Sequence, residues 1–156
     1  MSFEVVLVEP EIPQNTGNIA RTCAATNTVL NLIRPLGFNI DDKTVRRAGL
    51  DYWKYVDLRV YDSLEDFLSL NGDRRMYLAT TKGSISYADA EYRDGDLLFF
   101  GRETNGLPRD FIEDHRESAV RIPMSENTAA RSLNLSNSVN IILFEALRQT
   151  GFPELR

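Results

Sequence analysis

The stretch RSLNLSNSVNIILFEALRQTG, from Arg131 to Gly151, changes its apolar period part of the way along. Its first residues alternate leucine with small polar side chains, which is the period of a half-buried strand. From Val139 to Gln149, apolar residues recur at three- and four-residue spacing, which predicts an amphipathic helix. No glycine or proline separates the two parts. We therefore expect a small polar side chain, Ser136 or Asn134, to cap the helix.

The rest of the chain alternates strand-like and helix-like segments, which predicts an α/β fold with a largely parallel sheet. A length of 156 residues suits one domain, and we assign residues 1–156 to it. The predicted strands cover residues 3–8, 29–35, 56–62, 75–81, 96–101 and 119–123. The predicted helices cover residues 17–28, 41–49, 64–70 (capped by Ser63), 107–115 and 139–149.

Composition excludes several classes of protein. The single cysteine, Cys23, cannot form a disulfide within the chain, and with only one histidine no zinc-binding set of side chains exists. We find no signal-peptide pattern and no membrane-spanning apolar run, so we expect a cytoplasmic protein. His115 has no motif around it and is expected on the surface. The net charge of −5 argues against general nucleic-acid binding, although it allows a local basic patch.

Unusual residues follow three of the predicted strands, at the sheet edge where ligands bind in such folds. After the first strand, Asn18, Arg21 and Thr22 share one helix face. This segment is either a helix capped by Asn15 or Thr16 with a solvated arginine, or an anion or alkoxide site at a helix N-terminus.

The second segment, GRETNGLP, places Gly101 and Gly106 on either side of Glu103. The glycines allow a flat ligand to approach the backbone, or they form a turn into a helix that starts near Pro108. The segment lacks the Walker A and dinucleotide fingerprints, which argues against nucleoside triphosphates and NAD. The third segment, residues 121–139, is either a polar loop with an N-cap or part of the same site.

Basic and aromatic residues alternate in DDKTVRRAGLDYWKY, residues 41–55. Such a mixture suits phosphate contacts and stacking on unpaired bases. A surface helix followed by core aromatic residues would give the same pattern.

Together these segments resemble one family. NTGNIART, FFGRETNGLP and RIPM with RSLNLSNSV resemble the three motifs of SPOUT-superfamily RNA 2′-O-methyltransferases. EPEIPQNTGN, DDKTVRRAGLDY and TTKG are similar to the tRNA (cytidine/uridine-2′-O-)-methyltransferases that modify the wobble nucleotide. The resemblance runs in order from Val5 to Phe152, and it differs at the loop Met124–Ala130, which is longer than the usual spacing.

The resemblance implies a SPOUT fold with a deep C-terminal trefoil knot, S-adenosylmethionine as methyl donor, no metal, a homodimer and the tRNA anticodon loop as partner. The knot would make residues 131–136 a threaded loop, with Leu135 packed inward. The chain itself supports the dimer, because Ile141 and Phe144 form a second apolar set on the last helix.

The resemblance also implies roles for particular residues. Those matching the methyl-donor pocket are Ala79, Thr80, Gly101, Ile122, Met124, Ser132 and Leu133. Those matching catalytic positions are Arg21, Asn15, Asn18, Glu103 and Asn137. Those assigned to RNA are Lys43, Arg46, Arg47 and Tyr52.

The implied reaction is an in-line attack of a ribose 2′-hydroxyl on a sulfonium methyl group. Because a guanidinium group stays protonated in proteins, we expect Arg21 to stabilise the developing alkoxide. Glu103, an RNA phosphate or water would then take the proton. The alternatives are methylation of another tRNA or rRNA position, a non-catalytic RNA-binding module of the same fold, and a Rossmann-type oxidoreductase.

Overall fold

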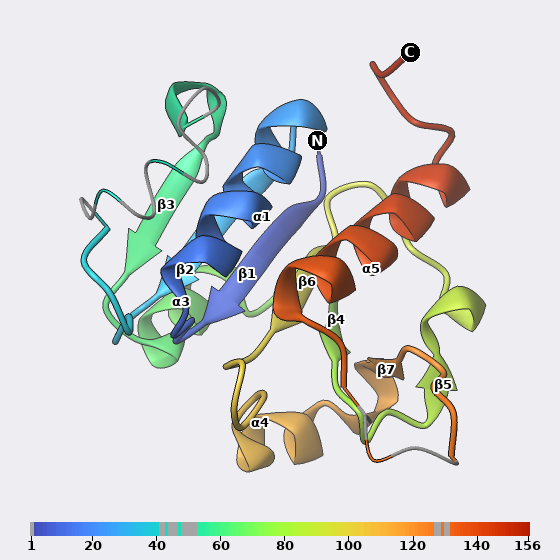
Figure 1. Ribbon diagram of the computed structural model, residues 1–156. Helices are drawn as coiled ribbons and strands as arrows, with labels where there is room; N and C mark the ends of the chain where they lie inside the picture. The colour runs from blue at the N-terminus through green and yellow to red at the C-terminus, as the bar shows by residue number, and fades with distance from the viewer. Residues whose placement is uncertain (1, 41–42, 44–46, 48–52, 127–128, 130–131) are drawn as a thin grey trace.

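The computed structural model describes residues 2–40, 43, 47, 53–126, 129 and 132–156. Its sheet has seven strands in the order β3-β2-β1-β6-β4-β7-β5 (Figure 1). Every strand pair in this described part of the chain is parallel, which confirms the predicted α/β class. The strands are β1 (Glu4–Val8), β2 (Val29–Ile33), β3 (Leu58–Tyr61), β4 (Met76–Ala79), β5 (Ile85–Ser86), β6 (Leu97–Phe100) and β7 (Ala119–Arg121).

Helices cover both faces of the sheet. The described helices are α1 (Pro13–Ala25), α3 (Leu64–Asn71), α4 (Arg109–Asp114) and α5 (Leu135–Gln149), with 3-10 turns η1 (Trp53–Tyr55), η2 (Tyr87–Asp89) and η3 (Arg116–Ser118). Helices α1 and α5 pack side by side on one face (Figure 1). On that face Val5 and Leu7 of β1 meet Ile19 and Val139, whereas on the other face Val6 belongs to the cluster of α3 and α4.

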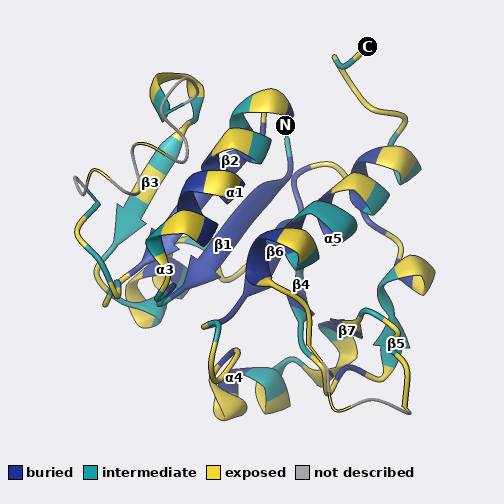
Figure 2. Ribbon diagram, viewed as in Figure 1, coloured by how far each residue is buried: buried dark blue, intermediate teal, exposed yellow. Residues whose placement is uncertain are grey.

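The central strands are buried throughout (Figure 2). Alternate residues of β1 face the two helical layers, so both sets must be apolar, and from Val5 to Val8 the strand is a continuous hydrophobic run. This burial explains why these strands were predicted within one or two residues of their bounds.

Helix α5 explains the change of period in the opening stretch. It begins at Leu135, so the prediction of a start at Val139 was wrong by one helical turn. The side chain of Asn134 accepts hydrogen bonds from the backbone N–H of Ser136 at 2.9 Å and from its hydroxyl at 2.6 Å, which confirms Asn134 as the N-cap. Leu135 and Ser136 belong to the helix rather than to a loop, and Leu135 packs into the core as expected.

One further predicted helix start, one short strand that was not predicted and one untested helix complete the comparison. Helix α1 begins at Pro13, not at Gly17, because proline at N1 has the φ that a helix needs and lacks an N–H that would be unpaired there. Strand β5 was read as loop, since two residues give no periodic signal. The predicted helix 41–49 lies mostly outside the described residues. Ser63 caps α3 as predicted, accepting from the backbone N–H of Asp66 at 3.0 Å.

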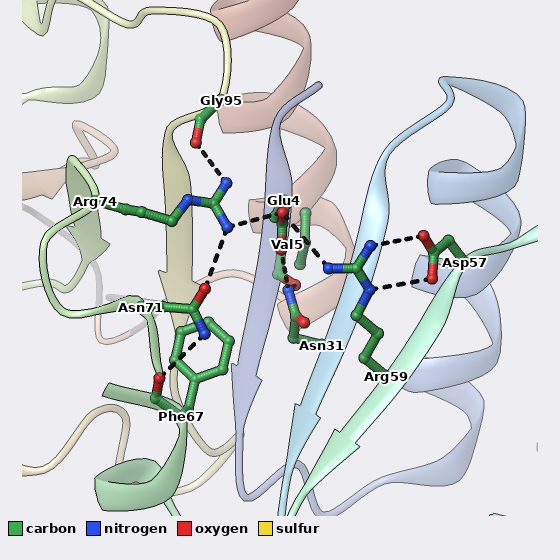
Figure 3. Close-up of polar contacts among 9 residues, drawn as sticks. All are labelled: Glu4, Val5, Asn31, Asp57, Arg59, Phe67, Asn71, Arg74 and Gly95. Carbon is green, nitrogen blue, oxygen red and sulfur yellow. Dashed lines mark hydrogen bonds and ion pairs between the residues drawn. The ribbon is translucent and has the colours of Figure 1, made fainter. Parts of the chain in front are cut away.

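A buried charged cluster lies at the amino end of the sheet (Figure 3). Glu4, 7% exposed, accepts from Arg74 Nη1 at 2.8 Å and from Asn31 Nδ2 at 2.9 Å. Arg59 lies 3.9 Å from the same carboxylate and also pairs with Asp57, whose hydrogen bond raises the pKa of Arg59. Because it is paired and hydrogen-bonded in this way, the Glu4 carboxylate has a structural role at the amino ends of the strands, opposite the carboxyl ends where ligands bind in such sheets.

The trefoil knot stays a prediction, because a strand order alone does not define how the chain is threaded. None of the helices in the described ranges is long and apolar enough to cross a membrane.

Candidate active site

A cleft of about 1470 Å³ opens beyond the carboxyl ends of β4, β6 and β7. Its walls are the segments that follow these strands, together with the start of α1 and the residues just before and within the first turns of α5. The position agrees with the expectation for a parallel sheet, where loops leaving neighbouring strands meet at one edge.

Every residue assigned to the methyl-donor pocket lines this cleft: Ala79, Thr80, Gly101, Ile122, Met124, Ser132 and Leu133. The loop after β4 is held by backbone hydrogen bonds, with Thr80 N–H donating to Val120 C=O at 2.9 Å and Gly83 N–H donating to Thr80 C=O at 3.1 Å. The lining therefore combines apolar side chains with fixed backbone groups, a surface that fits an adenine ring and a thioether.

Gly101 lines the cleft and also closes a tight turn, the second of the two roles considered for this segment. A Cβ atom at this position would lie 2.0 Å from the carbonyl carbon of Gly106 and 2.1 Å from the nitrogen of Leu107. The missing side chain thus makes room for the chain's own backbone, where Arg102 and Gly106 form an antiparallel bridge. Gly106 itself has φ +68°, a conformation that favours glycine. The two glycines close a tight loop, and that loop is one wall of the cleft.

Glu103 in this loop holds the start of α1. Its Oε1 accepts from the backbone N–H of Glu11 at 2.8 Å. Its Oε2 accepts from the backbone N–H of Ile12 at 2.8 Å and from Asn15 Nδ2 at 3.1 Å. The predicted caps Asn15 and Thr16 were wrong, because Ile12 occupies the N-cap position and the acceptor comes from a residue 91 positions away. A carboxylate here also complements the positive end of the helix dipole.

Asn15 and Glu103 line the cleft, whereas the other catalytic candidates stand outside its lining. Asn18 and Arg21 are exposed on α1, and Asn137 is exposed on the first turn of α5. These two helices are joined by a hydrogen bond of 2.8 Å between Thr22 Oγ1 and Asn140 Oδ1. The structure thus brings the first and third motifs together as packed helices beside the cleft.

The residues assigned to RNA are only partly described. Lys43 and Arg47 are exposed, whereas Arg46 and Tyr52 lie outside the described residues. Among the following aromatic residues, Trp53 packs against the core, and Tyr55 is 68% exposed with Lys54 Nζ 5.1 Å from its ring centroid. Trp53 therefore fits the interpretation as a core aromatic residue, whereas Lys54 and Tyr55 form an exposed basic and aromatic surface.

Sequence patterns did not single out several residues of the cleft. The cations are Lys82, Arg102, Arg109 and Arg116, two of which pair with carboxylates: Arg102 with Glu9 at 3.0 Å and Arg116 with Glu113 at 3.1 Å. Isolated surface cations give no periodic signal, so only their position around one cleft identifies them.

His115 is half-buried rather than on the surface. Its Nδ1 lies 3.0 Å from the backbone oxygen of Phe111, and its ring contacts the ring of the same residue. It is the residue at the C-terminal end of α4. Cys23 is buried in α1, and this burial raises the pKa of its thiol, so it is unsuited to nucleophilic chemistry.

Similarity to solved structures with this parallel sheet places the fold in the class of SPOUT RNA methyltransferases. A solved structure described as giving structural insights into the 2-OH methylation of C/U34 on tRNA has a TM-score of 0.90 and 44% sequence identity, covering 96% of this chain and 97% of that chain. An AdoMet-bound rRNA methyltransferase from Sinorhizobium meliloti has a TM-score of 0.84 and 27% identity, covering 94% of this chain and 56% of that one.

The chain belongs to the SpoU rRNA Methylase family, whose profile matches residues 2–144. Among curated relatives, the tRNA (cytidine(34)-2′-O)-methyltransferase of Methylovorus glucosotrophus is 47% identical over 154 residues, covering 96% of this chain and 97% of the relative.

Proposed function

We propose that this protein transfers a methyl group from S-adenosylmethionine to the ribose 2′-hydroxyl of the wobble nucleotide, cytidine or uridine 34, of tRNA. The observation that carries the proposal is that all the residues assigned to the methyl donor line one and the same cleft. Similarity over nearly the full chain to relatives named for position 34 supports the choice of nucleotide.

The residues of the cleft fit the proposed donor. Ile122, Met124 and Leu133 supply apolar walls, and the loop from Gly101 supplies backbone groups. S-Adenosylmethionine, when bound, supplies a methyl group already activated by its positive sulfur. The protein then has to hold the hydroxyl and the methyl group in line, a task that can account for much of the rate.

Arg21 and Glu103 receive distinct roles in this proposal. Arg21 stabilises negative charge on the attacking oxygen and contacts the neighbouring phosphate, because a guanidinium stays charged and presents several donors. Glu103 holds the start of α1, since both of its oxygens already accept hydrogen bonds from that segment. An RNA phosphate oxygen or water takes the proton.

The partners follow from exposed groups. We propose a homodimer that uses α5, where Phe144 is 45% exposed and the half-buried Ile141 lies one turn before it. We also propose that Lys43 and Arg47 contact the anticodon loop, with the cations around the cleft contacting its backbone. One sheet with a core on each face supports assigning residues 1–156 to one domain, and a tRNA substrate supports a cytoplasmic location.

The direct test incubates the purified protein with S-adenosylmethionine and total tRNA and maps the product by mass spectrometry. We expect one added methyl group on the ribose of nucleotide 34. A transcript carrying 2′-deoxyribose at that position is the matched control and should accept none. Methylation at another tRNA or rRNA position would favour the broader RNA methyltransferase, and donor and tRNA binding without turnover would favour a non-catalytic module.

A further inference from the structure

Two glutamates connect the loop after β1 with the loop after β6: Glu11 in the first and Glu103 in the second each accept hydrogen bonds from the other loop. Glu103 accepts from the backbone N–H of Glu11 at 2.8 Å. In return, Glu11 Oε1 accepts from the backbone N–H of Thr104 at 3.0 Å and from its hydroxyl at 2.8 Å. Each loop thus donates hydrogen bonds, at least one of them from a backbone N–H, to a glutamate of the other. These contacts join residues 92 and 93 positions apart in the sequence.

A third contact joins the same two loops. Arg102 Nη2 lies 3.0 Å from Glu9 Oε1. Glu9 has φ +55°, an unfavourable value for a residue with a side chain, and it directly follows β1. Because β1 and β6 are paired neighbours, with Leu7 opposite Phe100, both loops leave the sheet at the same place. The two glutamate contacts and the Arg102–Glu9 ion pair therefore lie close together and can act as one unit.

The two loops carry different parts of the site. The loop after β6 forms a wall of the cleft from Gly101 to Leu107, whereas the loop after β1 leads into α1, the helix of Asn15 and Arg21. Glu11 is partly exposed and is not among the residues that line the cleft. Its contacts nevertheless decide where Thr104, which lines it, is placed.

We infer that Glu11 is a positioning residue: with Glu103 it forms a reciprocal clamp that fixes the donor-side loop against helix α1. The inference rests on the proposed methyl transfer, in which one loop holds the donor and the helix carries the groups for the hydroxyl. A displacement of about 1 Å between such groups can lower a rate by roughly a hundredfold. Loss of Glu11 should accordingly affect turnover far more than donor affinity.

The first experiment requires neither donor nor RNA. Amide hydrogen exchange is measured by NMR in wild type and in Glu11→Ala. The variant removes the acceptor of the Thr104 amide, so that amide must exchange faster. A clamp further requires lower protection factors, which allow for the changed neighbouring side chain, at the amides of position 11 and Ile12, whose own acceptor, Glu103, is unchanged. If only the Thr104 amide responds, the two halves are independent and the clamp is refuted.

The second experiment measures single-turnover methylation and donor affinity in the same variants. For Glu11→Ala we expect a rate lower by about tenfold or more, with the dissociation constant of S-adenosylmethionine within about threefold of wild type. Glu11→Gln keeps one oxygen that can accept from Thr104 and should recover part of the rate. Glu65→Ala, an exposed carboxylate on α3, is the control and should change neither quantity.

The outcomes separate this inference from the proposed function. Equal losses in rate and donor affinity, without recovery in Glu11→Gln, would show a general structural role and overturn the inference. An unchanged rate in Glu11→Ala would also overturn it. If wild type fails to methylate tRNA, the proposed function fails, and the exchange experiment still decides whether the clamp exists.

Discussion

At the scale of single residues, the carboxylates near the cleft act as acceptors for backbone groups. Glu103 matches a catalytic motif, and its two oxygens accept three hydrogen bonds from the start of α1. A general base needs a lone pair directed at the hydroxyl that it deprotonates. The contacts seen here instead favour a role in holding the helix.

Glu103→Gln tests this assignment. We expect single-turnover methylation to slow by about tenfold or more at every pH, because misplacing the helix lowers the rate without changing any titration. The measurement is the rate against pH in wild type and variant. A variant whose pH profile loses a limb that wild type has would identify Glu103 as the proton acceptor and contradict the holding role.

Gly101→Ala should destabilise the loop after β6. The added Cβ would lie 2.0 Å from the Gly106 carbonyl carbon, so the backbone bridge between Arg102 and Gly106 must open. We expect donor affinity to fall by more than about tenfold, measured by calorimetry. Gly151→Ala is the control: its φ of +80° is strained for alanine, but no atom lies within 4 Å of the new Cβ. That variant should lose some stability and keep donor affinity.

The Glu11 carboxylate gives a pH dependence of stability. Hydrogen bonds from the Thr104 hydroxyl and N–H, aided by the Arg102 charge, lower the pKa of Glu11 below its ordinary value of 4.5, against an opposing effect of desolvation. Glu9 and Glu103 are the neighbouring carboxylates. A lowered folded-state pKa stabilises the fold above the unfolded value, and the effect disappears as pH falls through the folded value. Urea unfolding should show Glu11→Gln less stable than wild type above pH 4.5, with the difference shrinking below it. A difference independent of pH would contradict this linkage.

At the scale of elements, the N-termini of α1 and α5, the two helices beside the cleft, are capped in different ways. Helix α5 has a local cap, Asn134, one residue before it. Helix α1 is held at its start by Glu103 from another loop. A local cap can be read from adjacent residues, whereas a cap supplied by a distant residue cannot. This difference explains why one cap was predicted and the other was not.

Asn134→Ala should lower the free energy of unfolding by about 1 kcal/mol, the usual cost of losing such a cap. Asn134→Asp keeps an oxygen acceptor and a favourable charge at the helix start, so it should remain close to wild type. Urea titration of both variants measures the effect. An alanine variant as stable as wild type would show that the hydrogen bonds to Ser136 contribute nothing net.

At the scale of the whole molecule, the proposed dimer depends on the outer face of α5. Phe144 is 45% exposed, and a charge at this position should separate the protomers because it would be buried without a partner. We expect Phe144→Glu to give the monomer mass in light scattering after size-exclusion chromatography. Leu70→Glu, at a 75% exposed leucine on α3, should leave the mass unchanged. A dimeric Phe144→Glu would place the interface elsewhere.

Much of the fold was predictable because its signals are local. Strand β6 is a continuous apolar run, β1 and β2 are apolar except for Glu4 and Asn31, and α3 carries its own cap, Ser63. The starts of α1 and α5 were misplaced, since proline at N1 and an alternating pattern were both read as non-helical. The two residues of β5 pair with β7, a contact between segments that no local pattern reports.

The sequence by itself determined the fold class and the edge of the sheet that bears the site, because apolar periodicity is written in adjacent residues, and its family motifs named seven residues that all line the cleft. Only the tertiary structure decided that Gly101 makes room for backbone, that Glu103 holds the start of α1, and that Glu11 accepts hydrogen bonds from the loop that carries Glu103. These contacts join residues more than 90 positions apart, and they exist because β1 and β6 are paired in the sheet.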